Sequence, residues 1–404
     1  MSEPLTAIEA AARLGVKRET LYAYVSRGLL DRTLSLDGRT SLFDARQVDQ
    51  LRTSRRRPAR GELRTVITTG ITELDEAGHR YRGIPIAELT NSGFETVADL
   101  IWGHQGDWAG PIGLHQAVSA IVTQLPDATP PIDRLRVAIA VASGLDPLRY
   151  SPAPAAQAAA GRSMVSACTF ALGAALPRPA NEPASVATNL MLALSAADAG
   201  PVDPADVARA VDLALVLLAD HGLAASTFSA RIAASVRADP YSIVAAGMGP
   251  VGGQLHGAAS LGVHQLFLDV ATHGQSDAIG RQLASGQRFP GVGHTIYVEV
   301  DPREVLLRSL IEEIWAGDPR LETVTSVQAA LQEHVDLVTN IDFALGALTW
   351  LMGAPPWAGE VIFAAARIVG WIAHGIEEFS EKPVRFRPSA RYVGLPDPAA
   401  LETP

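Results

Sequence analysis

The stretch DVARAVDLALVLLADHG at residues 206–222 indicates the class of fold more clearly than any other part of the chain. Its apolar side chains recur at the spacing of a helix face, and its alanines leave a surface on which a second helix can pack closely. Similar helical periodicity, interrupted by Pro and Gly, continues through the chain from residue 65 onward. We therefore predict a mainly α-helical body.

Strand signals are sparse in this body. The sequence TVITTGITEL at residues 65–74 is its one convincing strand candidate. No repeat of about 20–50 residues is visible, and no G-x-G-x-x-G sequence follows a strand. These patterns argue against a repeat protein and against a dinucleotide-binding α/β unit.

Composition narrows the class of protein further. With 404 residues, of which 48% are hydrophobic, the chain is long enough for two or three structural units. Its single cysteine, Cys168, excludes a disulfide framework and a cysteine-based metal cluster, and it fits a reducing cytoplasm. No signal sequence and no membrane-spanning apolar run is seen, so we expect a cytoplasmic protein without a membrane partner or a bound metal.

Charge is distributed unevenly along the chain. Residues 1–64 contain 13 Lys and Arg against 8 Asp and Glu, a net charge of +5, which leaves −15 for the rest because the whole chain carries −10. The arginines of residues 55–64 stand around Pro58 and Gly61 and are typical of a basic linker. A solvated spacer has the same composition, so the linker alone does not indicate nucleic-acid binding.

The basic N-terminal part has the pattern of a helix-turn-helix module. Thr6 precedes IEAAARLGV and predicts a capped helix, Gly15 breaks it, and KRETLYAYVSRGLL at 17–30 predicts a second helix that ends at Gly28. DGRTSLF at 37–43 predicts a turn between short extended pieces, and ARQVDQLRTSRRR at 45–57 a third helix. Residues 1–54 thus resemble the winged DNA-binding domain of the MerR and excisionase type.

This resemblance implies that the second helix enters the major groove of DNA. The side chains that it would present there are Lys17, Arg18, Thr20, Tyr22 and Arg27. A module that serves only dimerisation or docking is an equal alternative, because the rest of the chain has the pattern of an enzyme.

Eight motifs follow one another in the body. They are YRGIPIAEL at 81–89, ADHGLAASTF at 219–228, LHGAA at 255–259, PGVGH at 290–294, DPR at 301–303, NIDF at 340–343, ARIVGWIAHGIEE at 366–378 and RPSARYVG at 387–394. A neutral imidazole can donate to a carbonyl oxygen, an arginine can clamp a carboxylate, and a buried carboxylate can remove a weakly acidic C–H proton. Such groups suit an enzyme that forms carbon–carbon bonds.

In this order, the eight motifs resemble the citrate synthase family over residues 65–394. The resemblance implies a two-domain helical fold that closes on its reactants. Its large domain would comprise residues 65–255 and 354–404, and its small domain residues 256–353. Hinges would lie near LHGAA and near LMGAPP at 351–356.

The resemblance also implies a role for each matching residue. His256 would hydrogen-bond the thioester carbonyl of acetyl-CoA as a neutral donor, Asp342 would remove the methyl proton, and His294 would polarise the ketone of oxaloacetate. The residues expected to bind oxaloacetate are His221, Arg303, Arg367 and Arg387. In the family the last of these comes from the partner subunit, which implies a homodimer.

The cofactor side of the site departs from the family pattern. Bacterial relatives often carry basic residues where this chain has Thr295 and Val298, and GGQLHGAAS replaces the usual GPLHGGANE around His256. The loss of two cations is expected to weaken CoA binding unless Arg288, Arg308 or the region of Arg162 compensates. Residues expected to contact the cofactor are Arg288, Gly291, Gly293 and Asn340.

Two function classes follow from these patterns. The first is condensation of acetyl-CoA with oxaloacetate to citrate, with no permanently bound cofactor. Propionyl-CoA, which would give 2-methylcitrate, is an open alternative because one methylene in an apolar pocket distinguishes substrates by only about 1–3 kcal/mol. The second is a metabolite-sensing regulator that binds DNA through its N-terminal domain. The complete set of His256, His294 and Asp342 favours the enzyme.

The other histidines carry weaker signals. His264, His273, His334 and His374 are interpreted as core or surface residues, and His79, His104 and His115 belong to no motif. For Tyr81 and Arg82 a place near the substrate and a structural role are equally consistent with the sequence.

Overall fold

The computed structural model divides the chain into two compact units, Met1–Thr68 and Thr69–Pro404. Each unit has its own cluster of buried apolar side chains. The structure describes residues 5–14, 16, 18–26, 30–35, 40–45, 47–48, 66–75, 78–173, 184–195, 202–253, 259–286, 288–294, 296–297, 299–334 and 338–389. The predicted linker at 55–64 lies outside these residues, so its role stays a prediction.

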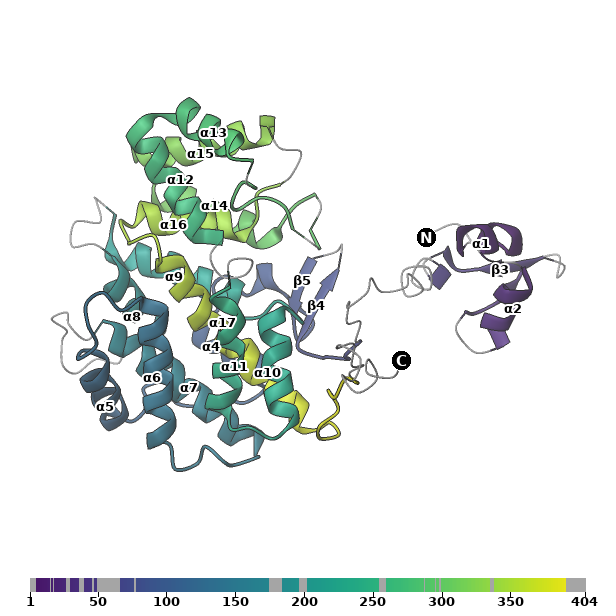
Figure 1. Ribbon diagram of the computed structural model, residues 1–404, viewed down its shortest axis with the longest axis horizontal. Helices are drawn as coiled ribbons and strands as arrows, with labels where there is room; N and C mark the ends of the chain where they lie inside the picture. The colour runs from purple at the N-terminus through teal and green to yellow at the C-terminus, as the bar shows by residue number, and fades with distance from the viewer. Residues whose placement is uncertain are drawn as a thin grey trace, which may run out of the picture. The chain divides into compact units, whose positions relative to one another are not determined.

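The N-terminal unit combines, in its described residues, two short helices with a small sheet (Figure 1). Its elements are β1 (Leu5–Thr6), α1 (Ala7–Leu14), α2 (Arg18–Ser26), β2 (Thr33–Leu34) and β3 (Ser41–Phe43), with antiparallel strands in the order β1-β3-β2. The capped start of α1 is confirmed, because the backbone N–H of Thr6 donates to Glu9 Oε2 at 2.8 Å and that of Glu9 to Thr6 Oγ1 at 3.4 Å. Most of the predicted third helix lies outside the described residues, so the winged helix-turn-helix domain stays a prediction.

The body begins with a three-stranded antiparallel sheet rather than with one strand. β4 (Thr72–Asp75), β5 (Gly78–Tyr81) and β6 (Ile84–Pro85) pair in that order. The prediction of a single strand was therefore incomplete. β5 has only four residues, and its sequence GHRY has too few apolar positions to reveal the alternation that buries His79 and Tyr81.

Helices make up the rest of the body, so the predicted mainly α-helical fold is confirmed. They are η1 (Ile86–Glu88), α4 (Phe94–Trp102), α5 (Ile112–Val122), α6 (Pro131–Leu145), α7 (Pro154–Leu172), α8 (Val186–Leu194), α9 (Pro204–Leu218), α10 (Ala225–Ser235), α11 (Pro240–Val251), α12 (Ala259–His273), α13 (Gln275–Ala284), α14 (Pro302–Ile314), α15 (Pro319–His334), α16 (Ile341–Leu351) and α17 (Ala358–Phe379). The stretch at 206–222 that predicted this class forms most of α9 and the turn after it.

The long helix α17 is the central element of the body (Figure 1). It packs against α4, α7, α9, α10 and α11, and nearly all of its side chains are buried. Among the described helices it alone is long and apolar enough to cross a membrane, but 89% of its most apolar window is buried inside the protein. Because a core helix has the same composition, this length and apolarity are weak evidence for a membrane span.

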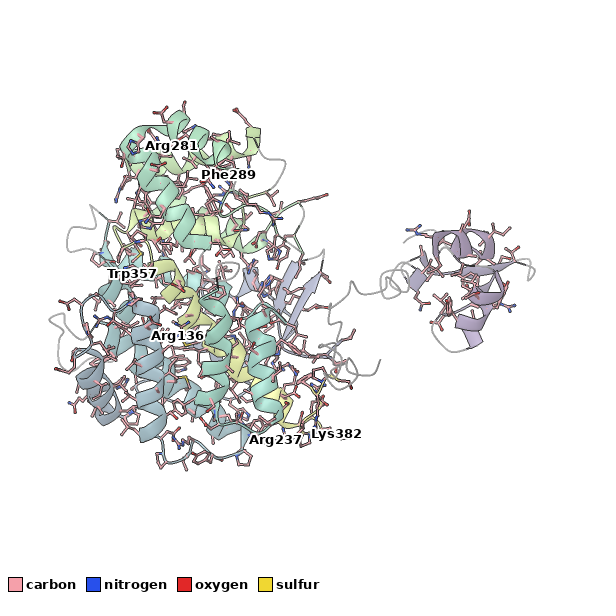
Figure 2. The ribbon with its side chains drawn as sticks, viewed as in Figure 1. Arg136, Arg237, Arg281, Phe289, Trp357 and Lys382 are labelled. Carbon is pink, nitrogen blue, oxygen red and sulfur yellow. The ribbon has the colours of Figure 1, made fainter. Side chains whose placement is uncertain are left out.

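Helices α12 to α16 gather at one end of the body (Figure 1). In Figure 2, Arg281 and Phe289 lie in this group, whereas Arg237 and Lys382 lie at the opposite end. Close packing joins the group to the rest, since a Cβ on Gly359 of α17 would lie 2.6 Å from Ser260 Oγ of α12. The predicted small domain, residues 256–353, covers the same helices, and its independent movement stays a prediction.

Candidate active site

The structure brings together two histidines that the sequence placed in different motifs. The ring centroids of His221 and His294 are 5.1 Å apart at an interplanar angle of 87°. Tyr297 joins them, because its hydroxyl lies 3.2 Å from His221 Nε2 and its ring stacks on His294 at 4.7 Å. Tyr297 belonged to no predicted site, and its role depends on a contact that sequence spacing does not reveal.

The tautomer of His294 follows from its hydrogen bonds. Its Nδ1 accepts the backbone N–H of Ile296 at 3.1 Å and that of Tyr297 at 3.2 Å. An accepting Nδ1 carries no proton, so the neutral ring holds its proton on Nε2. Burial and the positive charge of Arg303 both lower the pKa of His294. The ring is therefore a neutral donor, and its predicted role in polarising the ketone of oxaloacetate stays a prediction.

Arg303 is held in place by Asp301 at the start of α14. Its Nε and Nη2 donate to the two oxygens of Asp301 at 3.0 and 2.8 Å, and both side chains are almost wholly buried. Asp301 also caps two helices, since it accepts the backbone N–H of Arg303 at 3.1 Å and that of Ile341 at 3.0 Å. This carboxylate thus fixes the guanidinium and the first turn of α16 together.

Asp342 lies in the first turn of α16, directly after Ile341, whose backbone N–H donates to Asp301. Asn340 caps the helix, because its Oδ1 accepts the backbone N–H of Asp342 at 2.9 Å, while its Nδ2 donates to Gly293 O at 2.8 Å. Burial raises the pKa of Asp342 to about 6, although the nearby Arg303 acts to lower it. The carboxylate is ionised at neutral pH and is a stronger base than an exposed aspartate.

His221 lies in the turn that follows α9. Asp220 Oδ2 accepts the backbone N–H of Gly222 at 2.9 Å, and Gly222 has a left-handed φ of 61°. Burial, followed by the charge of Arg303, keeps the pKa of His221 well below its ordinary value, so this imidazole is neutral. Arg367, buried on α17, donates through Nε to Leu218 O at 2.9 Å at the end of the same α9.

His79 of β5 lies next to His221 in this site, although it belonged to no sequence motif. Its ring lies 5.4 Å from that of His221 and 4.8 Å from that of Tyr81. Burial and the charge of Arg303 lower its pKa to about 3. Both ring nitrogens are buried, and neither has a hydrogen-bond partner among the described residues. The only sequence signal was its alternation with Tyr81 on one face of a short strand.

The two residues left open by the sequence, Tyr81 and Arg82, both make hydrogen bonds within the protein. Tyr81 donates from its hydroxyl to Val216 O at 3.0 Å and to Asp220 O at 3.1 Å, which anchors the end of α9 beside His221. Arg82 donates to Ile101 O through Nε at 3.0 Å and Nη2 at 2.7 Å.

Two further residues were predicted from the motifs. His256 lies outside the described residues, so its role stays a prediction. Arg387 is exposed in the segment that follows α17. That segment begins near Lys382, at the end of the body opposite Phe289 (Figure 2).

The predicted cofactor contacts have roles within the protein. Gly291 has a φ of 73°, and an added Cβ would lie 2.6 Å from Val263 Cγ2 and 3.0 Å from Phe343 Cα. Its small size is thus required for packing, whereas we expected it to admit the cofactor. Gly293 has a φ of 76°, and its carbonyl oxygen accepts from Asn340 Nδ2. The Oδ1 of Asn340 accepts the N–H group of Asp342, so both polar atoms of its amide have partners.

Of the three candidate sources of compensating charge, two are already engaged. Arg162 is buried, and its Nε donates to Asp99 Oδ1 at 2.8 Å. Arg308 pairs with Glu304 at 3.0 Å and with Glu312 at 2.5 Å. Arg288 is exposed, makes no ion pair within the described part of the chain, and lines a cavity of about 600 Å³ between α12 and α13.

The side chains predicted to contact DNA are only partly described. Lys17 and Arg27 lie outside the described residues, as does the side chain of Arg18, and Thr20 is half-buried on α2. Tyr22 packs inside the unit, with its hydroxyl 3.3 Å from Ser41 Oγ and its ring against Phe43. Tyr22 is half-buried, so its predicted contact with DNA stays a prediction.

The described site combines two neutral imidazoles, two buried arginines and one basic carboxylate. Arginines suit a dicarboxylate, a neutral imidazole can stabilise a developing oxyanion, and the carboxylate can accept a proton. Among the described residues, no three His, Cys, Asp or Glu side chains are arranged to hold a metal ion. The geometry is suited to proton removal next to a carbonyl group.

Comparison with known proteins agrees with this chemistry. The family model described as citrate synthase, C-terminal domain, matches residues 62–389. The chain belongs to the citrate synthase family. The citrate synthase of Synechocystis sp. is 29% identical over 340 residues, which are 78% of this chain and 84% of that protein. The 2-methylcitrate synthase 1 of Corynebacterium glutamicum is 26% identical over 339 residues, 78% and 89% of the two chains.

Solved citrate synthase structures share the fold of the body. The enzyme of Pyrobaculum aerophilum superposes with a TM-score of 0.67 at 25% identity, over 82% of this chain and 91% of that one. A citrate synthase of Thermoplasma acidophilum, in a ternary complex with carboxymethyl coenzyme A and oxaloacetate, superposes with a TM-score of 0.66 at 22% identity. The match covers 82% of this chain and 95% of that one. Neither family membership nor these structures support the regulator that binds DNA.

Proposed function

We propose that this member of the citrate synthase family condenses an acyl-CoA with oxaloacetate and then hydrolyses the thioester. The observation that carries the proposal is the joining of three reactive groups by two capping residues. Asp301 ties Arg303 to the start of α16, and Asn340 ties Asp342 to the loop of His294. A substrate carboxylate, a ketone and an acidic C–H bond would each meet a matching group there.

Oxaloacetate would bind through charge and hydrogen bonds. Arg303 and Arg367 supply positive charge for its carboxylates, with His221 as a neutral donor beside them. The Nε2 proton of His294 would lie against the ketone oxygen and stabilise the negative charge that develops during attack. Neutral imidazoles are favoured beside these arginines because protonation would add like charge.

The acyl-CoA would be activated by Asp342. Its carboxylate removes a proton from the carbon next to the thioester carbonyl, and the resulting enolate forms a new C–C bond to the ketone carbon of oxaloacetate. The ketone oxygen gains a proton and becomes a hydroxyl. Water then attacks the thioester carbonyl, the C–S bond breaks, and the CoA thiol is released. His256 is the predicted donor to the enolate oxygen.

The acyl group could be acetyl or propionyl. Relatives named citrate synthase are 26–38% identical to this chain over the matched residues, and relatives named 2-methylcitrate synthase are 26–28% identical, so the two ranges overlap. The two CoA substrates should therefore be tested side by side. The ratio of their kcat/KM values assigns the preference.

Release of free CoA thiol tests the reaction. We expect purified full-length protein to release thiol when oxaloacetate is present with acetyl-CoA or propionyl-CoA, and not when oxaloacetate is omitted. Asp342→Asn keeps the shape of the side chain but removes the proton acceptor, so it is the matched negative control. Absence of oxaloacetate-dependent thiol release with both CoA substrates would contradict the proposal.

A further inference from the structure

One face of α17 contacts the backbone that leads into His221. The residues of this face are three and four positions apart: Arg367, Gly370 and His374. The Nε of the arginine donates to Leu218 O at 2.9 Å, and the backbone N–H of the glycine donates to Ala219 O at 3.0 Å. The Nε2 of the histidine lies 3.4 Å from Asp220 Oδ2. Three successive residues before His221 are thus each held by α17.

Gly370 makes this contact possible. A Cβ at this position would lie 2.3 Å from Asp220 Oδ1 and 2.8 Å from Ala219 O. Both distances are far shorter than ordinary van der Waals contact. Ala219 O is a main-chain atom, and the carboxylate of Asp220 is held by hydrogen bonds from Thr72 and Gly222. Any other residue at 370 would displace the segment that carries His221.

Asp220 holds the turn from the other side. Its Oδ2 accepts from Thr72 Oγ1 of β4 at 2.5 Å and from the backbone N–H of Gly222 at 2.9 Å. The backbone of Asp220 is bound as well, because the Tyr81 hydroxyl donates to its carbonyl oxygen. His221 therefore lies between two residues whose positions depend on one buried carboxylate.

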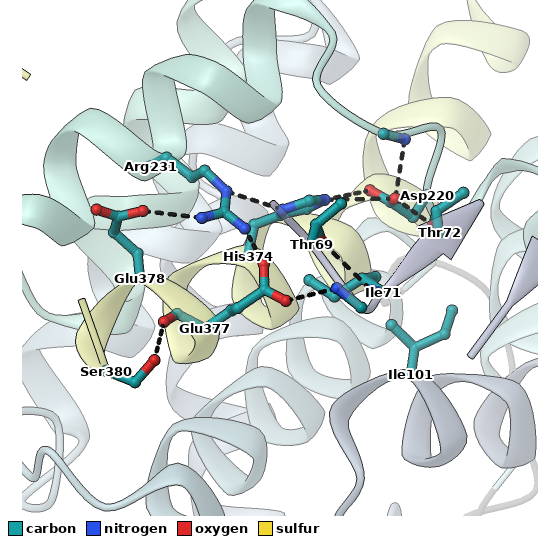
Figure 3. Close-up of polar contacts among 12 residues, drawn as sticks. Thr69, Ile71, Thr72, Ile101, Asp220, Arg231, His374, Glu377, Glu378 and Ser380 are labelled. Carbon is teal, nitrogen blue, oxygen red and sulfur yellow. Dashed lines mark hydrogen bonds and ion pairs between the residues drawn. The ribbon is translucent and has the colours of Figure 1, made fainter. Parts of the chain in front are cut away.

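His374 is oriented by Arg231, which is fully buried on α10 (Figure 3). Arg231 Nε donates to His374 Nδ1 at 3.0 Å, and guanidinium nitrogens do not accept hydrogen bonds. His374 Nδ1 therefore accepts, and Nε2 is the ring nitrogen that faces Asp220. The guanidinium of Arg231 is held by Glu378, which accepts from Nη1 at 2.8 Å, and by Glu377.

We propose that Asp220, Gly370 and His374 are positioning residues that set the place of His221 in the oxaloacetate pocket. None of the three is expected to touch the substrate. The inference rests on the proposed function, because it assigns these residues to the affinity for oxaloacetate. Arg231 contacts His374, and His374 contacts Asp220. Through these contacts the buried guanidinium of Arg231 would influence the position of His221.

A merely structural network predicts a different result. If the buried charges serve only to hold α10, α17 and the sheet together, a perturbation lowers the melting temperature but leaves oxaloacetate affinity unchanged. A positioning role also changes affinity for oxaloacetate, whereas the KM for the acyl-CoA is unchanged. The two roles therefore separate when stability and substrate binding are measured on the same variants.

The mildest test is Thr72→Val, which removes one hydrogen bond to Asp220 and nearly preserves the shape of the side chain. Its matched control is Thr169→Val, because Thr169 is also fully buried and its Oγ1 donates to Val165 O at 2.9 Å within α7. We expect Thr72→Val to raise the Kd of oxaloacetate, measured by calorimetry without acyl-CoA, about tenfold, as the loss of a hydrogen bond to a charged group implies. Thr169→Val should leave it unchanged.

Substitutions of His374 give a second measurement. The amide of His374→Gln can accept from Arg231 and donate to Asp220, whereas His374→Leu can do neither. We expect the glutamine variant to bind oxaloacetate within a few-fold of wild type and the leucine variant to bind more than tenfold more weakly. If the leucine variant does not fold, Thr72→Val decides the question.

Gly370→Ala adds an independent perturbation of the same segment, and it should raise the KM for oxaloacetate more than it lowers kcat. Unchanged oxaloacetate affinity in Thr72→Val and Gly370→Ala, with wild type active, would overturn the positioning role alone. Failure of wild type to bind oxaloacetate would overturn the proposed function together with the inference.

Discussion

Asp301 binds Arg303 through two parallel hydrogen bonds while its own oxygens cap α14 and α16. The same Asp-Pro-Arg sequence recurs at Asp318–Arg320, where the pair is more exposed and begins α15. One local motif thus occurs twice in this chain, once inside the candidate site and once outside it. The second copy is a natural control for the first.

Asp301→Asn should damage both stability and substrate binding. Removing one partner of a buried ion pair leaves a buried charge and costs roughly 3–5 kcal/mol. The free energy of unfolding should fall accordingly, and the KM for oxaloacetate should rise at least tenfold. Chemical denaturation and steady-state kinetics measure these changes. Asp318→Asn should have a smaller effect on stability and none on KM, and equal effects of the two substitutions would argue against a special role for Asp301.

The raised pKa of Asp342 predicts opposite effects on activity and stability. Because proton removal needs the ionised carboxylate, kcat should fall as the pH drops below about 6. A carboxyl whose pKa is higher in the folded state than in the unfolded state stabilises the fold in its protonated form, so its contribution is lost as the pH rises from 3.8 through 6. Asp342→Asn should therefore abolish activity but raise the melting temperature at pH 7.

This gain in melting temperature should disappear near pH 4, where the wild-type carboxyl is protonated in the folded state. Melting curves of both proteins between pH 4 and 7 test the sign. A constant difference across this range would contradict the predicted shift of Asp342.

The donor role of His294 predicts a large loss of rate. Removing one oxyanion donor typically lowers kcat about 100- to 1,000-fold, so His294→Leu should fall in this range. His294→Gln, whose amide can donate, should retain more activity. His273→Leu is a suitable control because His273 is exposed and pairs with Asp269 at 3.7 Å, away from the site. A loss below tenfold in His294→Leu would exclude the proposed polarisation of the ketone.

The predicted contribution of Arg387 across a homodimer can be tested by mixing two inactive variants. The Arg387→Ala variant keeps Asp342, and the Asp342→Asn variant keeps Arg387, which it can contribute to the partner's site. If the arginine acts in the partner's site, a mixed dimer contains one complete site, so refolding the two variants together should restore activity. Restoration should reach at most about one quarter of wild type, and no recovery in mixed dimers would place Arg387 in its own subunit's site or outside any site.

Helices and site residues differed in how far the sequence could predict them. The apolar periodicity of 206–222 predicted α9, because a helix face is a local property of the sequence. The motifs identified His221, His294, Arg303, Asp342 and Arg367, which the structure places in one site. The motifs did not give the partners of His221 and Arg367, because Tyr297 and Leu218 lie far from them along the chain.

His79 and Gly291 illustrate this limit. The ring of His79 contacts His221, which is distant in sequence, and the strand that carries it is only four residues long. Gly291 was expected to contact the cofactor, yet its close neighbours in the structure are Val263 and Phe343. A glycine in a sequence can indicate that another group packs closely against the backbone, but only the fold shows which group it is.

The imidazole of His294 is oriented by main-chain N–H groups at positions 296 and 297. Every residue except proline supplies such a donor, so these two hydrogen bonds do not depend on which side chains the loop carries. Thr295 and Val298 stand where the family resemblance leads us to expect basic residues. Under the proposed function, changes of CoA-binding side chains in this loop therefore leave the main-chain groups that orient His294 in place.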